Sequence, residues 1–389
     1  MQFYYPLFVD FIYRVMKIIY YFLLLLCIVS CKKADNKSIA LVDDIDVDIE
    51  DRKTLMSSFI ELNNVVPLET TDSSLLGSIE KIIKFDGDFY IKSKNRPLDV
   101  FSGTGKFKKK IGSLGVGPEE YVEVGDYDVD HDYIYILTIS QIQVYTQDGK
   151  FVRSIPLSLN ASGMRVLKNQ IVLFVLGDRN VIHVIDKDGV ERQAILARNQ
   201  ALRICKAIPF VKYRDEYLLF AQGRSNNILA YDVLTEAFKD MTYLASNNNL
   251  SIEEEVSLME NKSSYKREPN DYGAFFDGLS SSDNHIIFGS IDKNEITLWV
   301  KDILSKEVKA YYFSSLINDL TFTSTSSFFT GNTDGEKCFL SYMMPYHIAE
   351  GLKENISYAD SSNYIKMEKI IDSLDVEDAN PVIIEYTFK

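Results

Sequence analysis

Three related stretches decide the fold of this chain: DVFSGTGKFKKKI (residues 99–111), QVYTQDGKFVRSI (143–155) and HVIDKDGVERQAI (183–195). Each has apolar residues, a short turn-prone segment that contains glycine, and then a run of residues that ends in isoleucine. Alternating apolar residues on both sides of a tight turn predict two antiparallel strands, and glycine tolerates the positive φ that such a turn requires. Each stretch is therefore expected to form a β-hairpin.

The spacing of these hairpins indicates a repeated unit. The aligned glycines, Gly105, Gly149 and Gly189, are 44 and 40 residues apart, and weaker copies lie at 230–241 and 299–311. Short strands that repeat at about 40–50 residues are typical of the four-stranded blades of a β-propeller. The 24 tyrosines and 23 phenylalanines also favour strands over helices.

Other segments supply the remaining strands and two helical insertions. A sixth blade fits within 320–389, and helical spacing of apolar residues is expected at 251–268 and 346–374. The remaining alternating segments are 79–94 (a hairpin around Asp86-Gly87), 127–146, 164–177, 210–223 and 282–300. These patterns predict an all-β protein, a six-bladed β-propeller over residues 58–389 with short helical insertions.

The first 30 residues have the features of a bacterial lipoprotein signal peptide. Basic Arg14 and Lys17 precede an apolar run of 12 residues, which is shorter than the roughly 20 residues of a membrane-spanning helix. The run ends in Ile-Val-Ser-Cys, which resembles a lipobox with Cys31 as the lipid-bearing residue. A single-pass anchor that begins further upstream is the alternative, and Met16 is a candidate for the true start.

A lipid at Cys31 implies a membrane tether. Two or more acyl chains anchor a protein stably, so the mature chain is expected on the outer membrane, at the cell surface or on the periplasmic face. Residues 31–57 are polar, acidic and poor in aromatic residues, which predicts a flexible link to the propeller.

The composition restricts the classes of ligand. The net charge of -14 disfavours nucleic acid, because binding of phosphates requires basic groups. Four cysteines and four histidines show no metal-ligand spacing, and no hydrolase or metalloprotease motif occurs. No cofactor is therefore expected from the motifs, and catalysis is left open with a leaning against it.

The stretch IGSLGVGPEEY (111–121) resembles the G-x-G-P-x-E-Y signature of a Bacteroidetes lipoprotein family described as six-bladed β-propellers. Two further stretches, 66–82 and 378–389, are similar to the same family. The residues that match the signature are Gly115, Gly117, Pro118, Glu120 and Tyr121. The resemblance implies a fold and a location, but no reaction.

The residues of this stretch allow two interpretations. The favoured one is a loop between blades, in which glycine permits close backbone passage and Glu120 accepts backbone N–H groups. The other places Glu119 and Glu120 on the ligand-binding face. A phosphate-binding loop is disfavoured, because no Lys-Ser or Lys-Thr follows the glycines.

The run DYDVDHD places four aspartates, Asp126, Asp128, Asp130 and Asp132, at alternate positions. On a strand they would share one face, and hard oxygen ligands suit Ca²⁺. We interpret the run as a solvated strand entry and loop, with Asp126, Asp128 and Asp130 as weak candidates for a calcium site.

Three functions remain open. The favoured one is a membrane-anchored binding or scaffold module for a glycan, a peptide or an outer-membrane partner such as a transporter. The second is a hydrolase or lyase with its site at the mouth of the channel, using Ca²⁺. The third is a structural component of an assembly.

Overall fold

The computed structural model describes residues 52–389 except 176–177, 198–209, 215, 222–226, 244–273, 276–278, 293–294, 330–332 and 336. The described residues belong to one compact unit, Leu41–Lys389. The expected signal peptide with Cys31 and the expected helix at 251–268 lie outside the described residues.

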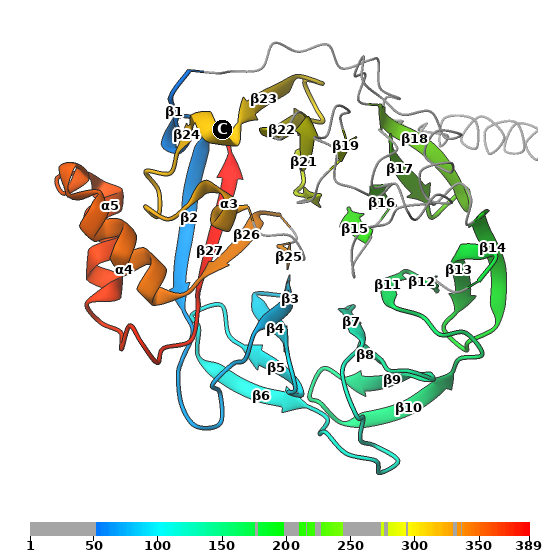
Figure 1. The fold of residues 1–389 in the computed structure, drawn as a ribbon. Coiled ribbons are helices and arrows are strands. Elements are labelled where there is room, and N and C mark those ends of the chain that lie inside the picture. The colour runs from blue at the N-terminus through cyan, green and yellow to red at the C-terminus, as the bar shows by residue number, and fades with distance from the viewer. Residues whose placement is uncertain are drawn as a thin grey trace, which may run out of the picture. The chain divides into compact units, whose positions relative to one another are not determined.

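Six sheets surround a common centre as the blades of a β-propeller, which confirms the predicted fold (Figure 1). In the second, third and fourth blades, chain order follows the order of the strands from the centre outward. The second blade contains β7 (Asp126–Val129), β8 (Tyr133–Leu137), β9 (Gln141–Thr146) and β10 (Phe151–Pro156). The third contains β11 (Gly163–Leu167), β12 (Gln170–Phe174), β13 (Asn180–Asp186) and β14 (Glu191–Ala197). The fourth contains β15 (Phe210–Tyr213), β16 (Tyr217–Ala221), β17 (Asn227–Asp232) and β18 (Ala237–Tyr243).

The other three blades include strands that are distant in sequence. The first contains β3 (Ile79–Phe85), β4 (Asp88–Ser93), β5 (Leu98–Phe101), β6 (Phe107–Ile111) and the short parallel strand β25 (Thr333–Asp334). The fifth contains β19 (Ala274–Phe275), β20 (Ser280–Ser281), β21 (His285–Asp292), β22 (Glu295–Asp302) and β23 (Val308–Tyr312). The sixth contains β26 (Phe339–Met343), β27 (Val382–Phe388) and the N-terminal β2 (Ile60–Pro67).

The glycines of the sequence repeat shape the hairpin turns and also set the spacing between blades. Each has a positive φ, of 81° at Gly105, 85° at Gly149 and 90° at Gly189. An added Cβ would meet the outer strand of the preceding blade, at 2.0 Å from Pro67 O for Gly105, 3.3 Å from Ile111 Cδ1 for Gly149 and 2.6 Å from Ile155 Cγ2 for Gly189. The backbone of each turn therefore favours glycine, and at Gly105 the main-chain oxygen of Pro67 also leaves no room for a Cβ.

The weaker copies of the repeat form turns that are one residue longer. In the fifth blade, Asp302 N donates to Glu307 O at 2.9 Å, whereas the corresponding bond of the first blade joins Ser102 N to Lys106 O at 2.8 Å. The positive φ of these longer turns falls on residues with side chains, Glu236 at 51° and Lys306 at 64°. The extra residue explains why glycine does not align in the later copies.

The hairpin expected around Asp86-Gly87 is confirmed. Phe85 pairs with Asp88, so the two residues between them form the whole turn. Asp86 and Gly87 both have positive φ, 47° and 79°, which is the backbone of the tightest common hairpin turn.

Strands from the two ends of the described chain close the ring. Strand β2 pairs antiparallel with β27, from Ile60 opposite Phe388 to Pro67 opposite Val382. This pairing completes the sixth blade and joins it to the first, because the chain runs from β2 directly into β3.

The predicted boundary of the flexible tether, at residue 57, is wrong. Strand β1 (Thr54–Leu55) pairs with β24 (Leu316–Ile317), and the following 3-10 turn η1 (Met56–Ser58) buries Met56 completely. The chain joins the fold here because Met56 packs into the hydrophobic cluster of the fifth and sixth blades.

The helical insertion expected at 346–374 is confirmed. Helices α4 (Pro345–Glu354) and α5 (Ser362–Ile371) lie between β26 and β27 in sequence. Pro345 starts α4, and the side chain of Ser361 caps α5 by accepting the N–H of Tyr364. Their apolar faces join the same cluster as Met56. The remaining short helices are α3 (Thr325–Phe328), η3 (Phe313–Ser315) and η4 (Ile356–Tyr358).

Candidate functional site

A buried ion pair joins two inner strands, β3 of the first blade and β7 of the second. Nζ of Lys81, on β3, lies 2.7 Å from Oδ1 of Asp126, on β7, and it also donates to the carbonyl of Tyr127. Both charged side chains are almost completely buried. An ion pair without contact with water needs further polar partners, because desolvation of two charges is costly.

The third and fourth blades supply those partners. Asp126 and Asp128 alternate along β7, and each accepts a main-chain N–H from β11 of the third blade. The acceptor–donor distances are 2.8 Å from Asp126 Oδ2 to Met164 N and 2.6 Å from Asp128 Oδ2 to Val166 N. Nζ of Lys212, on β15, lies 2.8 Å from Asp128 Oδ2. Two carboxylates thus connect β3, β7, β11 and β15, inner strands of four consecutive blades.

Arg165 lies beside this network. Its Nη1 is 3.7 Å from Asp126 Oδ2, and its Nη2 donates to Phe210 O of the fourth blade at 3.0 Å. Burial and, to a smaller extent, the nearby charge of Arg165 lower the pKa of Lys81 to about 8, against the opposing effect of Asp126 and Asp128. Burial alone would raise the pKa of Asp128, but Lys212, Arg165 and Lys81 outweigh it and hold that pKa below its usual value.

The expectation of a solvated strand entry is wrong for Asp126 and Asp128, which are buried. Asp130 lies beyond the strand. Its Oδ1 accepts the N–H groups of Asp132 and Tyr133, and its Oδ2 lies 2.8 Å from Lys187 Nζ. These carboxylates already hold ammonium and N–H groups, which occupy the oxygens that Ca²⁺ would need. Within the described residues, no three His, Cys, Asp or Glu side chains are grouped to hold a metal ion.

The stretch that resembles the family signature lies in the connection between β6 and β7, residues 112–125, which we call the signature loop. The carboxylate of Glu120 accepts the N–H of Gly117 at 2.9 Å, inside the loop. A Cβ on Gly115 would lie 2.0 Å from Glu120 Oε2, so glycine lets this carboxylate pack against the main chain of the loop. Pro118 is exposed, while Tyr121 is buried and its hydroxyl donates to Ile111 O.

Two side chains of β9 hold the loop from the second blade. The hydroxyl of Tyr145 donates to Glu119 O at 3.0 Å, and Nε2 of Gln143 donates to Glu120 O at 2.8 Å. The loop is therefore attached to the first blade through Tyr121 and to the second through its main chain. These contacts correspond to a loop between blades, and they leave the carboxylate of Glu119 exposed.

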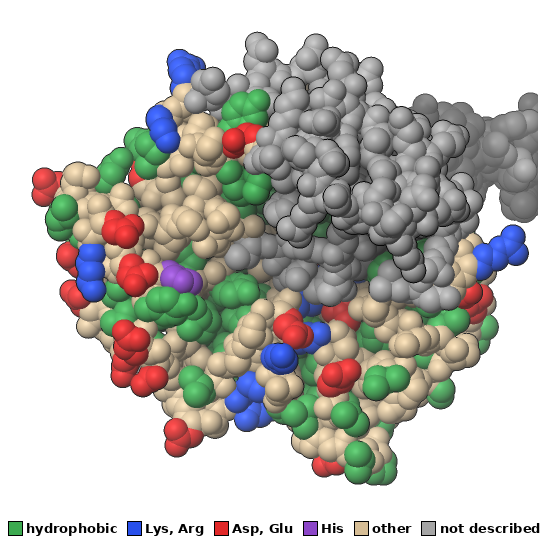
Figure 2. Space-filling model, viewed as in Figure 1, with side chains coloured by type: hydrophobic (Ala, Val, Ile, Leu, Met, Phe, Trp, Pro, Cys, Tyr) green, Lys and Arg blue, Asp and Glu red, His purple; other side chains and the backbone are tan. Residues whose placement is uncertain are grey.

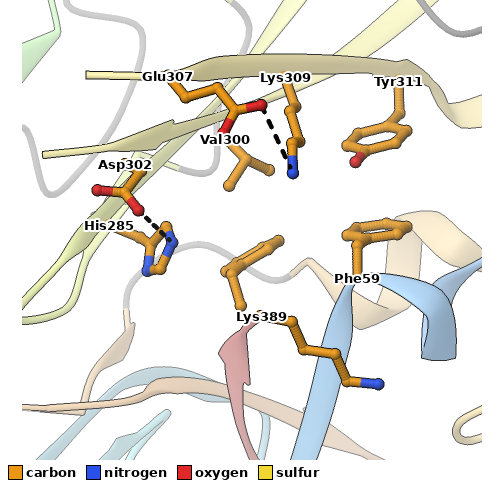
Figure 3. A pocket seen from close by; sticks show the side chains of 9 residues that line it. Phe59, His285, Val300, Asp302, Glu307, Lys309, Tyr311 and Lys389 are labelled. Atoms are coloured by element: carbon orange, nitrogen blue, oxygen red, sulfur yellow. Dashed lines mark ion pairs between the residues drawn. The ribbon is translucent and has the colours of Figure 1, made fainter. Parts of the chain in front are cut away.

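A small pocket of about 40 Å³ lies between the fifth and sixth blades (Figure 3). One side is an aromatic wall, in which the rings of Phe59 and Tyr311 stack with their centroids 4.3 Å apart. Lys309 extends into the pocket, and its Nζ lies 3.8 Å from Glu307 Oε1. The volume suits a few water molecules or one small polar group of a larger ligand.

A histidine and a carboxylate face each other on the opposite side of this pocket. Nε2 of His285 lies 3.8 Å from Oδ2 of Asp302. Burial lowers the pKa of His285 although Asp302 opposes it, so the imidazole is neutral at pH 7 and can both donate and accept a hydrogen bond. No local pattern in the sequence indicates this pocket, because its residues come from three separate segments, around 59, 285–311 and 388–389.

The fold and these contacts define a six-bladed β-propeller whose inner strands are joined by buried ion pairs. The chain belongs to the family described as Domain of unknown function (DUF4934), whose model matches residues 42–387. No curated protein matches the chain in sequence.

One solved structure shows the same fold, and two others align more weakly. A candidate exported protein of Bacteroides fragilis aligns with a TM-score of 0.69 at 15% identity, over 89% of this chain and 98% of that one. Streptogramin B lyase aligns with a TM-score of 0.38 at 16% identity, over 65% and 73% of the two chains. The extracellular domain of a hybrid two-component system of B. thetaiotaomicron aligns with a TM-score of 0.39 at 12% identity, over 63% and 28%.

None of the helices in the described ranges is long and apolar enough to cross a membrane.

Proposed function

We propose that this protein is a lipid-anchored, extracytoplasmic binding or scaffold module. The observation that carries the proposal is the commitment of the inner-strand charges to contacts between blades. Asp126 and Asp128 hold Lys81, Lys212 and main-chain N–H groups. Charges that are paired between blades make a rigid frame. The loops and the clefts between blades are then the surfaces that can recognise a partner.

Two observations support the location. The Bacteroides fragilis protein that shares the fold is described as a candidate exported protein. In the sequence, Cys31 follows a short apolar run in a lipobox-like context. Export and acylation at Cys31 would place the propeller on the outer membrane, at the cell surface or on the periplasmic face.

The charge of the surface bears on the kind of partner. Figure 2 shows acidic side chains gathered over α4, α5 and the segment that follows them. Residues 345–378 contain eight Asp or Glu and three Lys or Arg. An acidic surface repels nucleic acid and favours a basic or neutral partner, such as an outer-membrane transporter, a peptide or a glycan.

The test is a pull-down of the tagged full-length protein from gently solubilised membranes of its host, with protease added to intact cells in parallel. We expect a partner in stoichiometric amount and loss of the propeller on protease treatment if the protein faces outward. The matched control is Cys31→Ala, which removes the lipid site and should release the protein from membranes. A protein that stays in membranes after Cys31→Ala, or one recovered alone, would contradict the proposal.

A further inference from the structure

The signature loop exposes three aliphatic side chains close together in sequence. Leu114, Val116 and Val122 are 38%, 94% and 68% exposed. Single exposed aliphatic residues are ordinary on protein surfaces. Three of them within nine residues, on a loop that projects from the ring between the first and second blades, form a group (Figure 1).

The loop holds these side chains in a fixed arrangement. Glu120 ties Gly117 through its carboxylate, and the main chain closes on itself where Gly115 N donates to Tyr121 O at 3.0 Å. Tyr145 and Gln143 fix the loop to the second blade. A surface that is already ordered loses little conformational entropy on binding, which favours association.

The side chain of Val116 has little role in folding, because at 94% exposure it buries almost no apolar area. The charged residues of the loop itself have a single sign. Residues 112–125 contain Glu119, Glu120 and Glu123 and no lysine or arginine. Glu119 and Glu123 are exposed, so the loop presents two available carboxylates together with its exposed aliphatic side chains.

We infer that the signature loop is a docking knob for another protein, which offers an apolar recess bordered by lysine or arginine. The inference rests on the proposed function and names the surface that performs it. The apolar tip supplies buried area, and the carboxylates supply charge complementarity, which guides association and excludes acidic partners. An anionic membrane surface does not fit, because Glu119 and Glu123 would be repelled by its headgroups.

The test places a photo-crosslinking residue on the full-length lipoprotein in cells of its host. We expect Val116→p-benzoylphenylalanine to give one discrete adduct with another protein, mapped to an apolar peptide next to lysine or arginine. Leu234→p-benzoylphenylalanine is the matched control, since Leu234 is also an exposed aliphatic residue of a turn, at 70%. Its yield of that adduct should be at least tenfold lower. Adding Glu119→Lys and Glu123→Lys to the Val116 variant should reduce the adduct at least fivefold.

Several results would overturn the inference. The inference is wrong if position 116 gives no adduct or if positions 116 and 234 give equal yields. It is also wrong if the adduct forms only with lipid or with a second copy of this chain, or if the adduct survives the two charge reversals. If the membrane pull-down still recovers a partner while position 116 gives no adduct, the proposed function stands, but the signature loop is not the docking surface. If both experiments fail, both are wrong.

Discussion

Nζ of Lys81 lies 2.7 Å from Oδ1 of Asp126, and neither side chain reaches water although each comes from a different blade. The contacts continue into the third blade, because Asp126 also accepts the N–H of Met164. A buried ion pair contributes little net stability when it is intact, but loss of one partner leaves an uncompensated charge. The contact between the blades should therefore be sensitive to the charge of Asp126.

Asp126→Asn should reduce the free energy of unfolding by about 3–5 kcal/mol. Asparagine keeps the shape and can still accept Met164 N–H, but it leaves the charge of Lys81 buried beside Arg165. Denaturant unfolding of a chain from residue 31 measures the change. The matched control is Asp188→Asn, because Asp188 is 84% exposed and 3.3 Å from Arg153. Its effect should stay below about 1 kcal/mol, and equal effects of the two changes would contradict the role of burial.

The pKa of Lys81 predicts a pH dependence of stability. Burial lowers that pKa from 10.5 to about 8 in the folded protein. Between these values the unfolded chain binds more protons than the folded one, so the contribution of Lys81 to the free energy of unfolding rises with pH. The rise between pH 8 and 10.5 should be about 3 kcal/mol. It is measured as the difference in pH dependence between the natural protein and Lys81→Met, and parallel curves for the two would refute it.

Gly105→Ala should destabilise the protein more than Gly87→Ala. Both glycines have nearly equal positive φ, 81° and 79°, which costs an alanine about 1–2 kcal/mol. A Cβ at Gly87 meets nothing within 4 Å, whereas one at Gly105 would lie 2.0 Å from Pro67 O. Thermal unfolding should show the Gly87 variant losing about 1 kcal/mol and the Gly105 variant at least about 3 kcal/mol. Similar losses would mean that the contact with β2 adds nothing.

Lys306→Gly should stabilise the protein by about 0.5–1 kcal/mol. Lys306 has a φ of 64° in the longer turn of the fifth blade, and glycine adopts this backbone without the strain of a Cβ. The control is Lys306→Ala, which keeps the Cβ and should give no gain. A chemical denaturation midpoint that rises equally for both variants would attribute the effect to loss of charge instead.

The hairpins were predictable from sequence because their signals are local. The turn at Asp86-Gly87 and the repeat at Gly149 each place a glycine between alternating apolar residues, so the strands on either side could be recognised directly. The helices α4 and α5 were predictable for the same reason, from apolar residues at helical spacing.

The closure of the ring and the buried charges were not predictable in this way. Strand β2 pairs with β27 at the other end of the chain, and no local pattern marks such a partner. Lys81 and Asp126 look like solvated residues in sequence, since each becomes a buried ion only when another blade packs against it. The pocket beside Phe59 combines segments more than about 200 residues apart, which no spacing rule connects.

The pairing of β2 with β27 also sets an order of events during synthesis. Strand β2 is made first, and its partner β27 leaves the ribosome only after the segment between them. At roughly 5–20 residues per second, the intervening residues take from about 15 seconds to about a minute. Throughout that time the edge of β2 has no β27 to pair with, and an unpaired strand edge invites aggregation. The synthesis of the seven-residue strand β27 therefore determines when the edge of β2 is first covered.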